Sequence, residues 1–336
     1  MNPILNDPVL WNDWHPVAIA SQVATGTISP SQLLDLPLAI WRDSAGEVHV
    51  WEDRCPHRGT RLSLGAVQGD SVRCAYHGWS FGSDGRCKHI PALPALGEAG
   101  LKARAASFSV QERHGLVWAC LGTPSGFVPP FPEYDNAVLR KVWCGPYDVQ
   151  TSGPRIVENF LDMAHFAFVH EGILGDGEQP AIADYTVEPF DDPAYGQGIW
   201  ARHCRAWQPQ ASRAAAAGSE VEYSYRVVRP LCAILTKRSG EAVADAIALH
   251  LQPLTETSTR VWIILALADH ESSDAALRQF QDTIFLQDLP ILESQRPQRL
   301  PLIAGAEVSV ACDRMSLAYR AYLKQQRLRY GVLRAE

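Results

Sequence analysis

The first part of the chain alternates short runs of β-branched and aromatic residues with turn-forming Gly, Asp and Pro. Residues 38–41, 48–51 and 116–121 are runs of this kind. Apolar runs of four to eight residues, bounded by turn formers, are typical of β-strands. The pattern predicts a mostly β domain over residues 16–128, which follows a short N-terminal segment at residues 1–15.

A proline-rich stretch separates this part of the chain from the rest. Residues 129–133 read Pro-Pro-Phe-Pro-Glu, and we place a domain boundary there because proline continues neither a helix nor a strand ladder. Beyond it, the apolar spacing predicts helices at residues 155–170, 274–295 and 312–328, and strands at residues 221–228, 246–251 and 260–268. The small and polar residues 209–219 are expected to form an exposed loop. Residues 129–336 are therefore predicted to form an α+β domain.

Composition is that of an ordinary globular protein. The 336 residues are 46% apolar and 20% charged, with a formal net charge of −7. An acidic balance does not favour binding to nucleic acid or to an anionic membrane, so we expect a small-molecule substrate. The longest apolar run, residues 261–268, is far shorter than the roughly 20 residues of a membrane helix. Residues 1–20 lack the basic and apolar regions of a secretory signal, so we expect a cytoplasmic protein.

Four residues in the β-rich part have the spacing of a metal site. Cys55, His57, Cys74 and His77 form C-x-H, then sixteen residues, then C-x-x-H. A zinc site is the main alternative, but zinc fingers pair Cys with Cys and His with His, whereas each half of this motif supplies one of each. Two Cys on one iron and two His on the other are the ligands of a Rieske [2Fe-2S] cluster. We expect the nearby Cys87 and His89 to be structural. The isolated cysteines are expected to be buried: Cys120, Cys144, Cys204, Cys232 and Cys312.

The predicted helix at residues 155–170 contains a second group of metal-binding residue types. Asp162, His165 and His170 form D-x-x-H-x-x-x-x-H, with Glu158 and Asn159 one turn earlier. Asp162 and His165 share a helix face, whereas His170 is rotated by about 140° on a regular helix and requires a helix end or a bulge to converge. Two imidazoles and one carboxylate form the facial triad that binds non-haem Fe(II).

The third ligand of this triad lies elsewhere in the chain. The late helix offers four carboxylates, and spacing alone does not distinguish them: Asp274, Asp282, Asp288 and Glu293. Each one is also an acceptable solvated residue on a helix face. We expect the substrate pocket to be lined by the sheet, around residues 231–235 and 262–265. The basic residues Lys324, Arg327, Arg329 and Arg334 are expected to be a solvated helix face, with a docking patch for an acidic redox partner as the alternative.

The two motifs together resemble a known family. Residues 55–59, Cys-Pro-His-Arg-Gly, and residues 74–79, Cys-Ala-Tyr-His-Gly-Trp, resemble the Rieske signature. The second array is similar to the catalytic domain of Rieske non-haem iron oxygenases. Stretches at residues 158–174, 290–295 and 306–322 are similar to its small single-component members, such as methylxanthine N-demethylases and saxitoxin-tailoring hydroxylases.

This resemblance implies a fold and a role for each site residue. It implies an N-terminal all-β Rieske domain and a helix-grip catalytic domain, in which helices flank an antiparallel sheet. His165 and His170 would bind the mononuclear iron, with Asp288 as third ligand. Asp162 would link the iron site to a cluster histidine of a neighbouring subunit in a homotrimer. Asn159 corresponds to an asparagine near the iron.

The resemblance also implies the reaction. A separate reductase or ferredoxin would pass electrons from NAD(P)H through the [2Fe-2S] cluster to mononuclear Fe(II), where O2 is activated. We find no G-x-G-x-x-G after a predicted strand, so the nicotinamide would bind to another chain. The expected product is a monohydroxylated or demethylated aromatic or heterocyclic compound. Ring dihydroxylation is the alternative reaction, and a zinc-binding regulatory module is the alternative from another class of protein.

Overall fold

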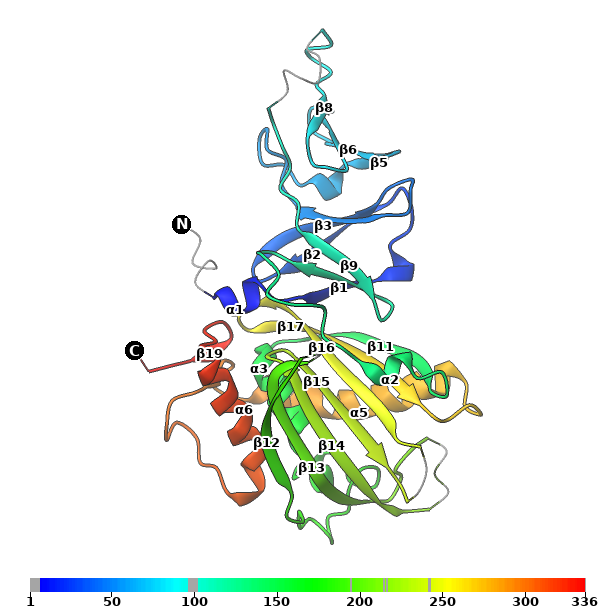
Figure 1. The fold of residues 1–336 in the computed structure, drawn as a ribbon, viewed down its shortest axis with the longest axis vertical. Helices are drawn as coiled ribbons and strands as arrows, with labels where there is room; N and C mark the ends of the chain where they lie inside the picture. The colour runs from blue at the N-terminus through cyan, green and yellow to red at the C-terminus, as the bar shows by residue number, and fades with distance from the viewer. Residues whose placement is uncertain are drawn as a thin grey trace. The chain divides into compact units, whose positions relative to one another are not determined.

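The computed structural model describes residues 7–95, 102–193, 195–213, 215, 217–240 and 243–335. The chain divides into two compact units, Met1–Val128 and Pro129–Glu336, and Figure 1 shows the elements of each. No helix in the described part of the chain combines the length and the apolarity that crossing a membrane requires.

The first unit consists of small antiparallel sheets with the strand orders β1-β10-β9, β2-β3-β4 and β5-β6-β7-β8. Its elements are α1 (Pro8–Trp11), β1 (His15–Ile19), η2 (Ala20–Gln22), β2 (Ile28–Leu33), β3 (Leu36–Arg42), β4 (Val48–Glu52), η3 (Leu62–Leu64), β5 (Ala66–Gln68), β6 (Ser71–Arg73), β7 (Ser80–Gly82), β8 (Cys87–His89), β9 (Ser109–Arg113) and β10 (Leu116–Cys120). The predicted all-β character of this region is confirmed.

An aromatic core supports the part of this unit that carries the cysteine and histidine motif. Trp41 of β3 and Trp51 of β4 are fully buried, and their rings meet edge to face at 5.0 Å between centroids. Cys55 and Cys74 belong to the same buried cluster. Burial of such large aromatic surfaces stabilises the unit and gives the two loops a rigid base.

The second unit is built on one seven-stranded antiparallel sheet with the order β11-β17-β16-β15-β14-β13-β12. Its elements are α2 (Pro132–Asp135), β11 (Arg140–Val149), α3 (Gly153–Leu161), α4 (Phe166–Val169), β12 (Thr186–Asp192), β13 (Gly196–Gln208), β14 (Ser219–Arg229), β15 (Cys232–Arg238), β16 (Asp245–Thr255), β17 (Ser258–Leu267), α5 (Asp274–Ser294), β18 (Leu300–Pro301), η5 (Ala311–Asp313), α6 (Arg314–Gln325) and β19 (Val332–Leu333). The predicted α+β class is confirmed.

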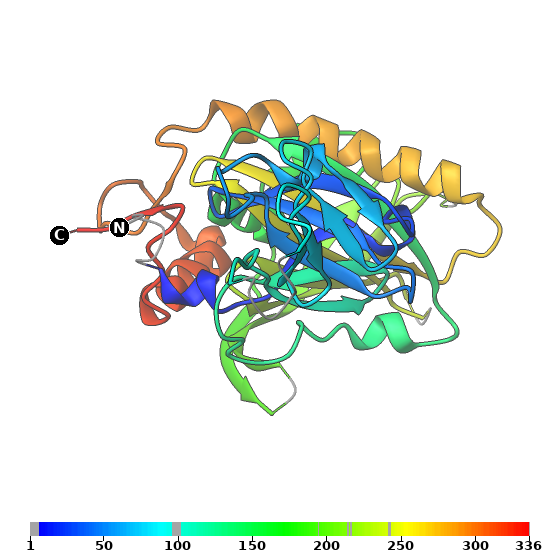
Figure 2. The same ribbon diagram turned by 90° about the horizontal axis from the view of Figure 1, so that it is seen from above.

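Helices flank this sheet. The long helix α5 packs along the sheet on the side of β11, as Figures 1 and 2 show in orange, whereas α6 packs near β12 and β13. The short helix α3 contacts β15, β16, α5 and α6. It therefore lies where the two longer helices and the sheet meet, and this position places the residues that follow it beside the apolar face of the sheet.

Several elements differ from the sequence expectations. The predicted helix at residues 155–170 is wrong as one element, because the chain leaves the helix after Leu161 and starts a new one at Phe166. Four strands of the seven-stranded sheet were not predicted: β11, β12, β13 and β15. In β11 the Gly-Pro pair at residues 145–146 occupies a bulge between Cys144 and Tyr147, so these turn formers do not end the strand. Pro189 is tolerated in β12 because this strand is at the edge of the sheet.

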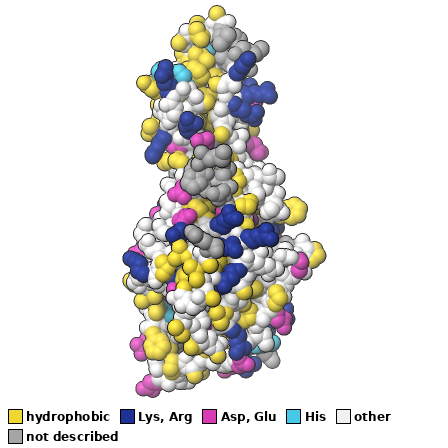
Figure 3. Space-filling model, turned by 90° about the vertical axis from the view of Figure 1, so that its left-hand side faces the viewer, with side chains coloured by type: hydrophobic (Ala, Val, Ile, Leu, Met, Phe, Trp, Pro, Cys, Tyr) yellow, Lys and Arg dark blue, Asp and Glu magenta, His cyan; other side chains and the backbone are white. Residues whose placement is uncertain are grey.

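The basic residues near the C-terminus are solvent-exposed, but they are not one helix face. Lys324 is in α6, whereas Arg327, Arg329 and Arg334 follow the helix. These three arginines line a shallow hollow, and Figure 3 shows dark-blue side chains gathered on the face that carries this segment.

Candidate active site

Two loops of the first unit repeat the same backbone arrangement around a cysteine. The amide of Cys55 donates to Thr60 O (2.7 Å), and the amide of Gly59 donates back to Cys55 O (2.9 Å). In the second loop Cys74 donates to Trp79 O (2.8 Å) and Gly78 donates to Cys74 O (3.0 Å). Gly59 and Gly78 have φ of +75° and +70°, a conformation that side chains disfavour, so glycine allows each loop to turn after its histidine.

The four metal-binding side chains of these loops differ in their exposure. Cys55 and Cys74 are buried, whereas His77 is exposed and its ring lies 4.6 Å from that of His57 between centroids. Burial, together with a hydrogen bond with Cys74, raises the pKa of Cys55 to about 11. A buried thiol that resists ionisation beside a second cysteine is typical of a site in which a metal supplies the compensating positive charge. This set fits a cluster whose thiolate ligands are buried and whose imidazole ligands lie nearer the surface.

Cys87 and His89 do not join this group. Cys87 is buried in the core, with its Sγ 3.7 Å from His89 O, and the His89 side chain is exposed. Among the isolated cysteines, Cys120, Cys144, Cys204 and Cys232 are buried as expected, whereas Cys312 is partly exposed, so its expected burial is wrong. Cys312 lies in the short helix η5, none of whose residues is buried.

The break between α3 and α4 brings the second group of ligand types together. Asp162 takes an extended conformation, and its Oδ1 accepts a hydrogen bond from the amide of Ala164 (2.8 Å). This turn places His165 before the first residue of α4 and His170 directly after its last. The break removes the angular mismatch that one regular helix would impose, so both imidazoles face the same point.

Two imidazole nitrogens and one carboxylate oxygen converge there. His165 Nε2 lies 3.2 Å from His170 Nε2. Asp288 Oδ1, from α5, lies 3.5 Å from His165 Nε2 and 3.3 Å from His170 Nε2. Although burial opposes it, the Asp288 carboxylate raises the pKa of His170. Three ligand atoms within 4.8 Å of one another form a group that can hold a metal ion.

The far side of each imidazole is held by a hydrogen-bond acceptor. His165 Nδ1 lies 3.3 Å from Asp162 Oδ2, and His170 Nδ1 lies 2.8 Å from Gln287 Oε1. An acceptor at Nδ1 keeps the proton on that nitrogen and leaves the lone pair of Nε2 for a metal, which is the arrangement usual for metal-binding histidines. The donor set and its outer partners therefore fit a mononuclear iron.

The other three carboxylates on α5 are engaged elsewhere. Asp282 accepts from the hydroxyl of Tyr147 (2.5 Å), Asp274 pairs with Arg140, and Glu293 accepts from the amide of Gln150 (2.9 Å). Only Asp288 lies with the two histidines among these four residues. Helical spacing could not distinguish them because it does not say which turn of α5 lies beside α4.

An apolar pocket opens onto the three ligand atoms. Asn159 lines it and donates from Nδ2 to Asp288 Oδ1 (3.3 Å). Other walls come from α3, α4, α5 and four strands, and include Phe160, Phe166, Tyr223, Tyr225, Leu235, Ile247, Leu249, Ile263, Ile284 and Phe285. The stretches expected to line the pocket, residues 231–235 and 262–265, contribute only Leu235 and Ile263. The aromatic walls suit a flat ligand.

Sequence reasoning missed Gln287 and the aromatic support of α5. Tyr147 of β11 stacks on Phe285 at 4.2 Å between centroids. Gln287 precedes Asp288, but nothing in its spacing from the histidines marks it as a partner of His170. Both contacts depend on how α5 packs against the sheet.

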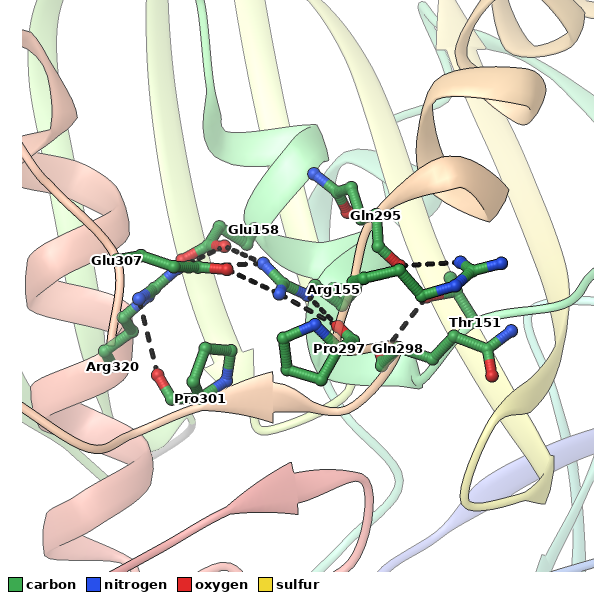
Figure 4. Close-up of polar contacts among 10 residues, drawn as sticks. Thr151, Arg155, Glu158, Gln295, Pro297, Gln298, Pro301, Glu307 and Arg320 are labelled. Atoms are coloured by element: carbon green, nitrogen blue, oxygen red, sulfur yellow. Dashed lines mark hydrogen bonds and ion pairs between the residues drawn. The ribbon is translucent and has the colours of Figure 1, made fainter.

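A largely buried ion cluster links α3, which leads into the site, to the C-terminal part of the unit. Figure 4 shows Arg155 and Glu158 of α3 together with Glu307 and Arg320. Arg320 binds both oxygens of Glu158 at 2.5 and 2.9 Å, and Arg155 binds Glu307 at 2.6 Å. Burial raises the pKa of Glu158 despite its two arginine partners. The cluster anchors the helix that supplies Asn159 and leads into Asp162.

Arg320→Met is expected to lower stability by about 3–5 kcal/mol, because it leaves a buried carboxylate without its main partner. The matched control is Arg299→Met, which removes an exposed pair with Glu256 (2.9 Å) and is expected to cost at most about 1 kcal/mol. Thermal unfolding of both variants measures the difference. Equal shifts in the unfolding midpoint would show that the buried cluster contributes no more than a surface pair.

Fold and site together define a class of protein, namely oxygenases in which an iron–sulfur domain precedes a domain for mononuclear iron. Comparison with known protein families agrees. The Rieske [2Fe-2S] domain matches residues 13–107, and the vanillate O-demethylase oxygenase C-terminal domain matches residues 149–329. The chain belongs to the Rieske oxygenases that carry this C-terminal domain.

Individual relatives cover most of the chain. The methylxanthine N1-demethylase of Pseudomonas putida is 30% identical over 333 residues, 96% of this chain and 91% of that protein. A probable methylxanthine N7-demethylase of Pseudomonas sp. (strain TJI-51) is 39% identical over 238 residues, 70% of this chain and 83% of that protein. The solved structure of the N1-demethylase of Pseudomonas putida CBB5 with caffeine has a TM-score of 0.80 at 28% identity, covering 94% of this chain and 90% of that one.

These matches confirm the predicted enzyme class and its cofactors. The protein is an oxidoreductase that uses O2, a Rieske [2Fe-2S] cluster and a mononuclear iron, and a reductase supplies its electrons. Its substrate is a small molecule. The cytoplasmic location stays a prediction.

Proposed function

We propose that this oxygenase removes an N- or O-linked methyl group from a small planar aromatic or heterocyclic compound. The observation that carries the proposal is the apolar, aromatic-walled pocket that opens onto His165, His170 and Asp288. The relatives are methylxanthine demethylases, and this activity favours the same reaction.

We assign the metal ligands as follows. Cys55 and Cys74 hold one iron of the cluster, and His57 and His77 hold the other. His165, His170 and Asp288 would hold the mononuclear iron, which would supply the activation of O2 needed to hydroxylate the methyl group. Hydroxylation of a methyl carbon on nitrogen or oxygen yields an unstable product that releases formaldehyde.

The residues around this iron site position its ligands and exclude water. Asp162 and Gln287 keep the Nδ1 protons of His165 and His170 in place. Both Nε2 lone pairs therefore point toward the proposed iron position. Asn159 donates to Asp288 and thereby restrains the carboxylate within the pocket. The aromatic walls hold a flat ring by apolar contact and leave little room for solvent beside its methyl group.

We also propose a homotrimer, in which a cluster histidine of one copy meets Asp162 of the next. His77 is exposed, and the side chain of Asp162 is 34% exposed, so both are accessible for such a contact. The chain mass is 37.0 kDa. Light scattering of the purified protein is expected to give about three times the mass of one chain, and a monomer would contradict the assembly.

Metal analysis of anaerobically purified protein tests the ligand assignment. We expect about three irons per chain, two of them in a cluster with the low average g value of histidine ligation. A colourless, zinc-containing protein would overturn the assignment. After reduction with dithionite, one exposure to O2 with an N-methylxanthine or a methoxybenzoate should release formaldehyde, and no reductase is needed for this single turnover.

A further inference from the structure

The substrate pocket contains one cationic side chain whose role the reaction does not explain. Among the described residues that line it, Lys237 of β15 is the only lysine or arginine. Lys237 pairs with Tyr223 on β14 and with Asp245 on β16. Because side chains alternate along a strand, Lys237 lies on the same face of the sheet as Leu235, which also lines the pocket.

The position of Lys237 marks one end of the pocket. Lys237 also borders a second, outer hollow, which is lined by Ala211 and Asp245 and is not bordered by the candidate iron ligands. The inner pocket therefore extends from His165, His170 and Asp288 at one end to Lys237 at the other.

The ammonium group of Lys237 has donors to spare. Its Nζ donates to Ala211 O at 2.7 Å, and in the described part of the chain no carboxylate lies within salt-bridge distance of it. An ammonium has three N–H donors, so two are available to a ligand. Burial lowers the pKa of Lys237, whereas the charge of Asp245 favours its protonated form. Asp245 itself accepts from the amide of Ala268 (2.8 Å) and lies on the side of the outer hollow.

A second polar group that lines the same pocket is unpartnered. The Tyr225 side chain is 1% exposed, lines the same pocket, and its hydroxyl has no hydrogen-bond partner among the described residues. The neighbouring hydroxyl of Tyr223, by contrast, accepts from Gln208 Nε2 at 2.6 Å. Tyr225 pairs with Leu235, so Lys237 is its diagonal neighbour at about 7–8 Å between backbones, within reach of two long side chains. A buried hydroxyl without a hydrogen-bond partner is unfavourable unless a ligand supplies that partner.

We propose that Lys237 and Tyr225 form a subsite for an anionic oxygen of the substrate, either a carboxylate or a deprotonated ring oxygen. The opposite end of such a substrate, with its methyl group, would then face the iron ligands. The subsite deepens the proposed function because it names the substrate class. It rests on the proposed function in one respect, namely that its ligand is the compound to be demethylated. The anion supplies the charge that compensates a half-buried ammonium, and its oxygen accepts a hydrogen bond from the Tyr225 hydroxyl.

Four probes, two anionic and two neutral, test the subsite on oxidised holoenzyme. The pair 4-methoxybenzoate and 4-methoxybenzamide differs in charge but hardly in shape. The pair 1,3-dimethylurate and caffeine tests a ring oxyanion against a neutral ring at pH 8. Calorimetry is expected to show that at least one anionic probe binds with an affinity about 10-fold or more above that of its neutral counterpart. Hydrogen bonds to charged groups are stronger than neutral ones by an amount that corresponds to about this ratio of affinities. The pair that shows the preference distinguishes a carboxylate from a ring oxyanion.

Variants then assign the preference to the two residues. Lys237→Met is expected to lower affinity for the preferred anion by about 10-fold or more, with the neutral probe within about 2-fold. Lys237→Arg should retain the preference, and Tyr225→Phe should weaken it. The control is Arg238→Met, the next cation on β15, which is exposed and 4.0 Å from Glu222. Iron content and unfolding temperature show whether each variant is intact.

The outcomes separate the subsite from the demethylase proposal. Equal binding of charged and neutral probes by the wild type, no binding of either anion, or a preference that survives Lys237→Met overturns the subsite. Formaldehyde release from the neutral probes in that case leaves the demethylase function standing. Binding of an anion that depends on Lys237 but yields no formaldehyde in a single turnover supports the subsite and contradicts demethylation of that compound.

Discussion

Asp288→Ala is expected to remove the mononuclear iron and to leave the Rieske cluster in place. The metal content should fall from about three irons per chain to about two. Turnover should fall by more than about 100-fold, because loss of a ligand exceeds the 10–100-fold loss typical of its outer partners. The reason is geometric, since Asp288 Oδ1 is the one carboxylate oxygen within 3.5 Å of both Nε2 atoms in the described part of the chain.

The matched control is Asp282→Ala on the same helix. Asp282 bonds to Tyr147 and not to either histidine, so this variant should keep three irons even if α5 is less stable. The visible and paramagnetic spectra of the cluster should be the same in both variants. Loss of iron from the Asp282 variant, together with a full complement in the Asp288 variant, would reverse the assignment of the third ligand.

Local motifs explain why the first unit could be predicted so closely. Each half of the cluster motif spans only a few residues, and the hydrogen bonds that shape it join residues four or five positions apart. The conformation around Cys55 and Cys74 is therefore determined mostly by residues of their own loops. The strands β3 and β4 likewise follow from runs of apolar residues that fold into a buried aromatic core.

The second site depends on tertiary contacts that spacing does not encode. Apolar periodicity continues through Asp162, so it predicted one helix where the structure has two, and the turn at Ala164 became visible only in the fold. The choice of Asp288 depends on the register of α5 against the sheet. That register is set partly by the stacking of Tyr147 on Phe285. Tyr147 lies in β11, a strand that was not predicted because it contains a Gly-Pro bulge.

The proposed anion subsite was beyond sequence reasoning for a similar reason. Lys237 is followed by Arg238, and nothing in the sequence distinguishes the half-buried cation from the exposed one. Only the pairing of β15 with β14 and β16 places Lys237 beside Tyr223 and on the pocket face. A single shift of register would exchange the two residues between the faces of the sheet.

Asp162→Asn is expected to retain both metals but to lower turnover by about 10–100-fold, the loss typical of an outer partner of a metal ligand. The amide can still accept from the Ala164 amide through Oδ1, so the turn between α3 and α4 should persist. It cannot present a carboxylate to His165 Nδ1, which lies 3.3 Å from Asp162 Oδ2 in the native chain. The charged contact that we propose with a cluster histidine of the neighbouring copy would be lost as well.

Two measurements distinguish this positioning role from a structural one. In single turnovers, the rate of oxidation of the reduced cluster, which visible absorption follows, and the rate of product formation should both fall. Iron content and oligomeric mass should stay unchanged. The control Asp176→Asn alters a matching turn, in which Asp176 Oδ1 accepts from the amide of Glu178 at 2.9 Å, and should leave the rate within about 2-fold, as surface substitutions usually do. Full activity of the Asp162 variant with both metals bound would exclude the carboxylate as a link, because its charge would then be dispensable to electron transfer between the two sites.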